Sequence, residues 1–153
     1  MVACVVEENE RDVLFNYLQK YLYELSLYYG DTMDDKGNFC YKYFPLYFQE
    51  EDRAAYFFVE DDERIGFALI NAHSFTDEKI ENCIAEFTIF PAYRHGGKGM
   101  EAIAALKGVR EGKWQLKYSK ENSSAMRFWQ QVKERYHGIE QPLEENEMII
   151  TFK

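Results

Sequence analysis

A glycine-rich segment from 91 to 100 holds the residues best suited to chemistry in this chain. It reads Pro-Ala-Tyr-Arg-His-Gly-Gly-Lys-Gly-Met, follows an apolar run and precedes residues at helical spacing. A turn of this kind leaves main-chain N–H groups free, glycine lets a ligand approach the main chain, and the dipole of the following helix favours negative charge. The sequence therefore predicts an anion cradle here, and pyrophosphate is the anion we expect.

The formal charges inside this segment are all positive, although the whole chain is acidic. Arg94 and Lys98 are cationic and His95 adds a charge when protonated, whereas the chain has 18 basic against 27 acidic residues and a net charge of −9. The net charge argues against nucleic acid as a partner, because Lys and Arg supply most of that affinity. It is compatible with a cationic amine substrate, or with acidic solubility alone.

Length and composition indicate one folded domain spanning residues 1–153. The apolar fraction of 46% and the many aromatic residues argue against disorder. The three widely spaced cysteines form neither a zinc pattern nor a disulfide framework, which predicts a reducing, cytoplasmic location. The apolar run at 2–6 is too short for a signal peptide or a membrane span, so no membrane partner is expected. His73 and His137 are isolated, so no metal site is expected either.

The elements that must position the glycine-rich segment follow from hydrophobic periodicity. Strands are predicted at 2–6, 55–59, 65–71, 80–90, 113–118 and 148–152, and helices at 9–30, 100–110 and 122–136. Asn9 is the predicted cap of the first helix and Gly30 its predicted end. The aromatic segment at 40–48 stays unassigned. This order is typical of an α/β sandwich that combines a mixed sheet with helices.

Two motifs, one in the turn and one at the start of the last helix, occur in a recognisable order. They are Arg94-x-x-Gly97-x-Gly99 and Asn122-x-x-Ala125-x-x-Phe128-Trp129. A glycine-rich turn alone is a weak signal, but this one has a strand before it and a helix after it. Together the motifs resemble those of the GNAT family, the acyl-CoA-dependent N-acetyltransferases.

The resemblance covers most of the chain, with its specific motifs between Glu86 and Trp129. The blocks at 86–90, 112–114 and 128–129 are most similar to a small bacterial subgroup of predicted acetyltransferases without a known substrate. The resemblance implies an α/β (α+β) fold whose central sheet is mixed, mostly antiparallel and built from six to seven strands. It also implies about four flanking helices and a V-shaped splay between the strand at 80–90 and the strand at 113–118.

A binding site for acetyl-CoA as co-substrate is also implied by the resemblance. Pantetheine would pair with main-chain groups in the splay as an added strand does, and pyrophosphate would lie over the N–H groups of 95–99. A Cβ at Gly97 or Gly99 would keep the phosphate away. Arg94 either touches a phosphate or braces the turn, and Asn122 caps its helix and, by resemblance, meets the cofactor arm. The predicted cofactor-binding residues are Phe87, Ile89, Arg94, His95, Gly96, Gly97, Lys98, Gly99, Asn122 and Phe128.

The implied reaction is direct attack of a primary amine on the thioester in a ternary complex. Glu86 is the candidate general base, because a carboxylate in mid-strand with apolar neighbours is unusual. An edge position or an ion pair is the alternative reading of Glu86. Strict strand alternation places Glu86 on one face with Ile84 and Phe90, and Ala85 on the other face with Phe87.

The sequence departs from the family pattern at Trp129, where many members have a tyrosine that protonates the departing thiolate. Indole does not ionise in a useful range, so another group must act. Tyr118 is the catalytic candidate that we name, with Tyr93, water or unaided departure of the thiolate as alternatives.

The acceptor is expected to be a small amine, and the protein a monomer or a homodimer. The helix tyrosines Tyr17, Tyr21 and Tyr28 belong to the core, or they line an acceptor pocket with the aromatic segment at 41–48. Two other functions stay open. One is a non-catalytic domain that binds or senses acyl-CoA, which Trp129 favours. The other is an acetyltransferase for protein N-termini or lysines.

Overall fold

A computed structural model describes all residues from 1 to 153, and its centre is one seven-stranded sheet. The strand order is β1-β2-β3-β4-β5-β7-β6. Every neighbouring pair is antiparallel except β4 and β5, which are parallel. The predicted mixed, mostly antiparallel sheet is therefore confirmed. The strands are β1 (Val2–Val5), β2 (Ala54–Glu60), β3 (Glu63–Asn71), β4 (Asn82–Ile89), β5 (Trp114–Ser119), β6 (Ile139–Pro142) and β7 (Glu147–Phe152).

Three α-helices accompany the sheet, so the expectation of about four was too high. The segment between α1 and β2 contains no α-helix. There the Asp34 carboxylate accepts the N–H groups of Lys36 and Asn38 and closes a loop. Pro45 then lies in the first turn of a 3₁₀ helix, where no N–H donor is needed. The helices are η1 (Glu8–Glu10), α1 (Arg11–Tyr29), η2 (Phe44–Phe48), η3 (Pro91–Tyr93), α2 (Lys98–Val109) and α3 (Ser123–Arg135).

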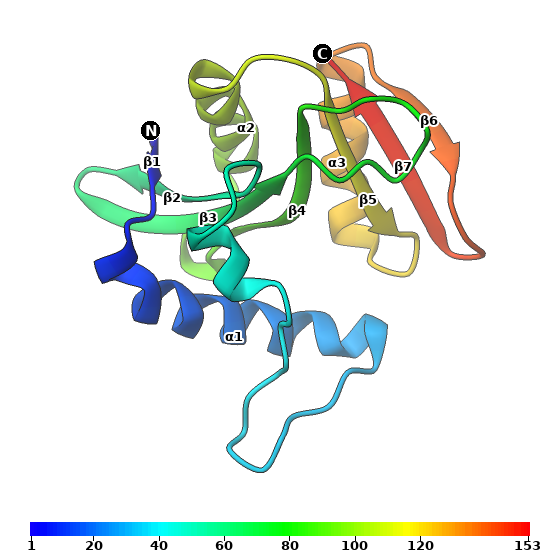
Figure 1. Ribbon diagram of the computed structural model, residues 1–153. Coiled ribbons are helices and arrows are strands. Elements are labelled where there is room, and N and C mark those ends of the chain that lie inside the picture. The colour runs from blue at the N-terminus through cyan, green and yellow to red at the C-terminus, as the bar shows by residue number, and fades with distance from the viewer.

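The two faces of the sheet carry different helices, with α1 on one face and α2 and α3 on the other (Figure 1). On the first face, Leu14 and Leu18 of α1 are fully buried in a cluster with Phe57 and Phe67. None of the helices combines the length and the hydropathy that a membrane crossing requires.

The second face has the larger cluster, in which α2 and α3 cover the middle of the sheet. Ile103 and Leu106 come from α2, and Val132 comes from α3. They pack with strand residues such as Phe58 and Leu116. Each face of the sheet is therefore covered by its own helices, with α1 on one side of β4 and β5 and α2 and α3 on the other side.

Strands β4 and β5 stay paired only at their beginnings. The parallel register covers Asn82–Ile84 against Trp114–Leu116. Beyond it, β4 continues to Ile89 along β3, and β5 continues to Ser119 along β7. The two strands therefore diverge, and the predicted V-shaped splay is confirmed (Figure 1).

A β-bulge in β4 changes which side chains share a face. Leu69 pairs with Glu86 and Ile70 pairs with Ile84, so Ala85 is the extra residue. Ile84 consequently joins the α2/α3 cluster, whereas Ala85 joins the α1 cluster. The strict alternation expected for this strand was wrong at these two positions, because a bulge inserts one residue and reverses the order of faces.

The ends of two elements also differ from the expectation. Helix α1 begins at Arg11 and not at an Asn9 cap, since η1 precedes it and the Glu7 N–H donates to the Glu10 carboxylate. Gly30 ends α1 in the left-handed region, with φ of 69°, as expected. Strand β6 was missed because it is short, mostly exposed and ends in Pro142, so its only order comes from pairing with β7.

Candidate active site

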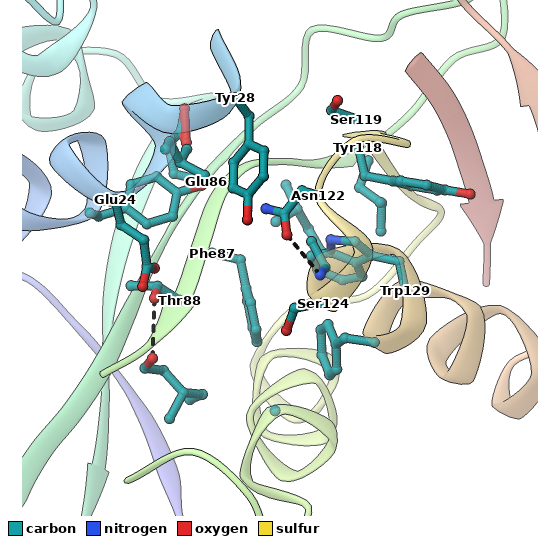
Figure 2. A pocket seen from close by; sticks show the side chains of 18 of the residues that line it. Glu24, Tyr28, Glu86, Phe87, Thr88, Tyr118, Ser119, Asn122, Ser124 and Trp129 are labelled. Carbon is teal, nitrogen blue, oxygen red and sulfur yellow. Dashed lines mark hydrogen bonds between the residues drawn. The ribbon is translucent and has the colours of Figure 1, made fainter. Parts of the chain in front are cut away.

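The splay opens a cleft of about 390 Å³ between β4 and β5. The C-terminal half of α1 covers one side, and the glycine turn and the first turn of α3 close the others (Figure 2). The structure therefore brings together predicted site residues from four separate segments of the chain. Those that line the cleft are Glu86, Phe87, Ile89, Arg94, His95, Gly99, Tyr118, Asn122 and Phe128.

The glycine turn presents an unbroken row of free N–H groups. From His95 to Met100, no main-chain N–H donates to an acceptor in the protein. The first bond of α2 runs from the Glu101 N–H to the Gly97 carbonyl, at 3.1 Å. Six successive donors at a helix N-terminus form the kind of anion cradle expected from sequence.

The glycines of the turn serve different purposes. Gly97 has φ of 79°, in the left-handed region, and an added Cβ there would meet no atom within 4 Å. At Gly99, an added Cβ would lie 2.5 Å from the Phe128 ring. Space for a phosphate was the expected reason for Gly99, but the close packing of α2 on α3 already requires a glycine at this position.

Arg94 is partly exposed and is fixed in place by several hydrogen bonds. Its Nε donates to the Ile89 carbonyl at 2.7 Å, and its two terminal nitrogens donate to the two Glu24 oxygens at 2.9 and 2.8 Å. Arg94 thus braces the turn and ties it to α1, which is one of the two roles expected for it. A contact with phosphate stays a prediction. Lys98 is also paired, with Glu60 at 2.6 Å.

The register of β4 directs alternate main-chain groups into the cleft. The Phe90 N–H donates to the Ile65 carbonyl at 2.8 Å across the β3–β4 pair. Because antiparallel partners alternate, the main-chain groups of Phe87 and Ile89 face away from β3 and toward the splay. The Ile89 carbonyl is occupied by Arg94, as described above, and the Tyr21 hydroxyl approaches the Phe87 main chain. The groups directed into the splay are therefore those of Phe87, which Tyr21 shares, and the Ile89 N–H.

The start of α3 is fixed by a side-chain cap. The Asn122 Oδ1 accepts the Ala125 N–H at 3.1 Å, so the structural role of Asn122 is confirmed. Its amide N–H groups have no acceptor in the protein, and Figure 2 shows the side chain at the edge of the cleft. One turn later, Phe128 stacks on Phe87 with ring centroids 5.5 Å apart. The contact of Asn122 and Phe128 with a cofactor stays a prediction.

Glu86 lies at the floor of the cleft, on the α1 side. Its carboxylate accepts a hydrogen bond from the Tyr41 hydroxyl at 3.2 Å and is also approached by the Tyr21 hydroxyl. Burial raises the pKa of Glu86 to about 7, and hydrogen bonds from Tyr21 and Tyr41 and the charge of Lys117 only partly oppose this rise. No cation pairs directly with Glu86, because Lys117 pairs with Glu147 at 3.3 Å.

Tyr118 forms part of the cleft wall, but its hydroxyl is directed away from the cleft (Figure 2). Strand β5 places the ring in the α2/α3 cluster with Trp114. The hydroxyl donates to Glu140 at 2.9 Å and accepts from Gln130 at 2.9 Å. Burial, with the bond to Glu140, raises the pKa of Tyr118 to about 12. The structure therefore directs this hydroxyl away from the splay, where the departing thiolate is expected, and the role of Tyr118 as the acid stays a prediction.

The alternative acid Tyr93 also points elsewhere. Its hydroxyl donates to Glu63 at 2.7 Å, and it does not line the cleft. Four residues outside the predicted catalytic and cofactor-binding sets take part as well, and three of them are tyrosines that the alternative acceptor-pocket interpretation includes. Helical spacing on α1 was the signal for three of the four, since they recur every three or four residues on one face. They are Tyr21, Glu24 and Tyr28 of α1, together with Tyr41.

Away from the cleft, His73 is less isolated than its sequence position indicates. Its ring lies with the carboxylates of Glu50 and Asp52, so that one ligand atom of each falls within 4.8 Å of the others. Arg53 already donates to Glu50 at 2.9 Å and contacts His73 at 3.3 Å. We therefore interpret this exposed group as an ion-pair network.

No protein-family model matches the sequence, and a search of curated proteins finds no match. Solved structures are similar. An acetyltransferase from Thermus thermophilus has a TM-score of 0.69 and 11% identity, over 97% of this chain and 94% of that chain. The N-acetyltransferase PseH from Campylobacter jejuni, solved with acetyl coenzyme A, has a TM-score of 0.60 and 12% identity, over 99% and 96%. A Bacteroides thetaiotaomicron protein assigned to the GNAT family has a TM-score of 0.61 and 15% identity, over 99% of this chain and 86% of that chain.

At such low identities the similarity establishes the fold and leaves the substrate open. The similarity extends over at least 97% of this chain in each case, so it includes the strands and helices that build the cleft. This chain has the fold of the GNAT acetyltransferases.

Proposed function

We propose that the protein is an N-acetyltransferase that transfers the acetyl group of acetyl-CoA to the primary amine of a small molecule. The observation that carries this proposal is the row of six free N–H groups from His95 to Met100, at the mouth of a cleft that ends at Glu86. We further propose that residues 1–153 act as one catalytic domain. The exposed, unpaired thiols of Cys4 and Cys40 support a reducing, cytoplasmic location.

The cofactor would lie along β4. Pyrophosphate accepts the N–H groups of the turn, and the amide groups of pantetheine pair with the main chain of Phe87 and Ile89. The free amide of Asn122 donates from the opposite side. Three residues of strand from Ile89 to Glu86 span roughly 10 Å, so a thioester at the end of an extended arm reaches the carboxylate.

In the proposed reaction Glu86 is the general base, and a main-chain N–H group stabilises the oxyanion. Glu86 accepts the proton of the amine, and with a pKa of about 7 its carboxylate is present at neutral pH. The amine nitrogen attacks the carbonyl carbon, and the Phe87 N–H that faces the splay stabilises the tetrahedral oxyanion. The C–S bond then breaks and the thiolate leaves.

Direct transfer is supported by the state of the nearest thiol. Cys83 is buried, and burial raises its pKa to about 12, so it is a poor nucleophile at neutral pH. No acyl-cysteine step is therefore needed, and a ternary complex of enzyme, acetyl-CoA and amine is the simplest mechanism.

The surroundings of Glu86 favour a small acceptor over a protein. The rings of Tyr21 and Tyr28 from α1 and the Tyr41 hydroxyl from the following loop enclose this end of the cleft. An amine fits such a site, because aromatic faces and a carboxylate both attract cations. A protein N-terminus or lysine would require a more open groove.

A non-catalytic acyl-CoA-binding domain is the second candidate, because Trp129 is buried against Phe87 and the Tyr118 hydroxyl faces away. Incubation with acetyl-CoA and a panel of small amines separates the two functions when free thiol is followed. The enzyme is expected to release thiol in an amine-dependent manner. Tight CoA binding without release for any amine would establish the sensor and overturn the enzyme.

A further inference from the structure

The proposed reaction needs a group that protonates the departing thiolate, and three tyrosines at or near the cleft are already engaged. The hydroxyls of Tyr21 and Tyr41 interact with the Glu86 carboxylate. The Tyr118 hydroxyl is bonded to Gln130 and Glu140 on the far side of β5. None of these three hydroxyls is free to donate to sulfur in the splay.

Tyr28 differs from these tyrosines in both position and bonding. It belongs to the last turn of α1, lines the cleft, and its hydroxyl bonds to no group of the protein. Figure 2 shows the ring reaching down from α1 with its hydroxyl inside the cleft, directed toward Asn122 at the start of α3. Glu86, Tyr28 and Asn122 all line this cleft, into which the pantetheine arm is expected to reach.

The position of Tyr28 is also held from the cofactor side. Glu24 lies four residues before Tyr28, on the same face of α1. Both Glu24 oxygens accept from Arg94, which in turn bonds the Ile89 carbonyl. The ion pair between Arg94 and Glu24 therefore holds the part of α1 that carries Tyr28. The same ion pair holds the glycine turn, so it fixes the position of Tyr28 relative to the anion cradle.

We propose that Tyr28 is the general acid of the transfer, an inference that rests on the proposed function. The amine forms the new C–N bond and gives its proton to Glu86, while the C–S bond breaks and its electron pair stays on sulfur. The Tyr28 O–H donates its proton to that sulfur and leaves CoA as the thiol. Solvent then returns a proton to the Tyr28 oxygen and removes the proton from Glu86, so both groups are restored.

The test is Tyr28→Phe, with Tyr23→Phe as the matched control. Tyr23 lies on the same helix, is 66% exposed and is outside the cleft, so the control removes the same atom without reaching the site. In Y28F, kcat for amine-dependent thiol release is expected to fall about 100-fold, the typical contribution of a general acid. The KM for acetyl-CoA and the Kd for CoA are expected to stay within twofold of wild type.

Three results distinguish this inference from the proposed function. A melting temperature and a CoA-induced thermal shift equal to those of wild type show that Y28F keeps its fold and its cradle. If wild type and Y23F are active and Y28F matches them, Tyr28 is not the acid although the enzyme assignment stands. If wild type releases no thiol with any amine, the proposed function itself fails.

Discussion

Glu86 is partly buried at the cleft and accepts hydrogen bonds from neutral partners only. The hydroxyls of Tyr21 and Tyr41 approach its carboxylate, but no cation pairs with it. Burial therefore outweighs the favourable contacts and raises the pKa of Glu86 to about 7. This value lies where a general base is most useful at neutral pH, because the group is ionised yet still basic.

Replacing Glu86 by Gln is expected to lower kcat about 100-fold at neutral pH, because the amide cannot accept the proton of the amine. In wild type, activity should rise as the pH passes through about 7, since the carboxylate is the active form. The measurement is the pH–rate profile of both proteins. Glu63→Gln, outside the cleft, is the control and should leave the profile unchanged. If the Glu86→Gln variant showed the same rise in activity near pH 7 as wild type, Glu86 would not be the general base.

At the scale of elements, the junction of β4 and α2 decides where an anion can bind. Helix η3 follows the strand, and after Arg94 the three residues before α2 all have positive φ, of 79°, 69° and 79° for His95, Gly96 and Gly97. This left-handed path leaves the N–H groups without internal acceptors. The element junction, more than any side chain, thus creates the cradle.

The pair Gly97→Asp and Gly97→Asn tests the cradle. Both side chains are similar in size and tolerate the left-handed region, but only Asp places a negative charge beside the free N–H groups. In wild type, CoA at one hundred times its Kd is expected to add about 2.7 kcal/mol to the free energy of unfolding. G97N should keep most of the resulting thermal shift, and G97D should weaken CoA binding at least tenfold. Equal shifts in the two variants would argue against an anion at this turn.

Packing of α2 on α3 makes a separate prediction for Gly99→Ala. The added Cβ would lie 2.5 Å from the Phe128 ring, so the variant is expected to lose about 1–3 kcal/mol of unfolding free energy. A double-mutant cycle with Phe128→Ala, followed by chemical denaturation, checks the cause. In the F128A background the same change should cost far less. An equal cost in both backgrounds would show that the strain does not come from Phe128.

For the whole molecule, the cleft is an opening between two layers that are each stabilised independently. Helix α1 has its own cluster on one face, and α2 and α3 share the other. Arg94 and Glu24 connect the turn on one side of the cleft to α1 on the other. Because the two layers flank the splay, groups such as Glu86 are desolvated by the global fold and not by their local strand.

The desolvation of Glu86 should make the free energy of unfolding depend on pH. The pKa of Glu86 is about 7 in the folded state against an ordinary value of 4.5, so the folded state holds the extra proton between these pH values. Stability is therefore lost as the pH rises through this window. Relative to wild type, Glu86→Gln should gain up to about 3 kcal/mol of unfolding free energy at pH 8 compared with pH 4. Urea denaturation at both pH values checks this difference, and no difference would mean that the carboxylate is solvated.

Much of the fold was predictable because its signals are local. The left-handed glycine at position 30, the alternation of β5 and the cap at Asn122 each depend on residues within a few positions. The turn motif and the start of α3 likewise identified the cradle, since free N–H groups follow from a strand, glycines and a helix in sequence. Strand β6 lacked such a signal, because only β7 gives it order.

By itself, the sequence determined most strands and helices, the free N–H groups of the glycine turn and the presence of a carboxylate in β4, because periodicity and turn chemistry act over short distances. The sheet topology was implied by the family resemblance. Only the tertiary structure decided which side chains meet in the cleft. The bulge at Ala85 set the faces of β4, β5 directed the Tyr118 hydroxyl away, and α1 brought Tyr28 into the cleft. The physical reason is that these contacts join segments separated by tens of residues, and their geometry depends on how the layers pack.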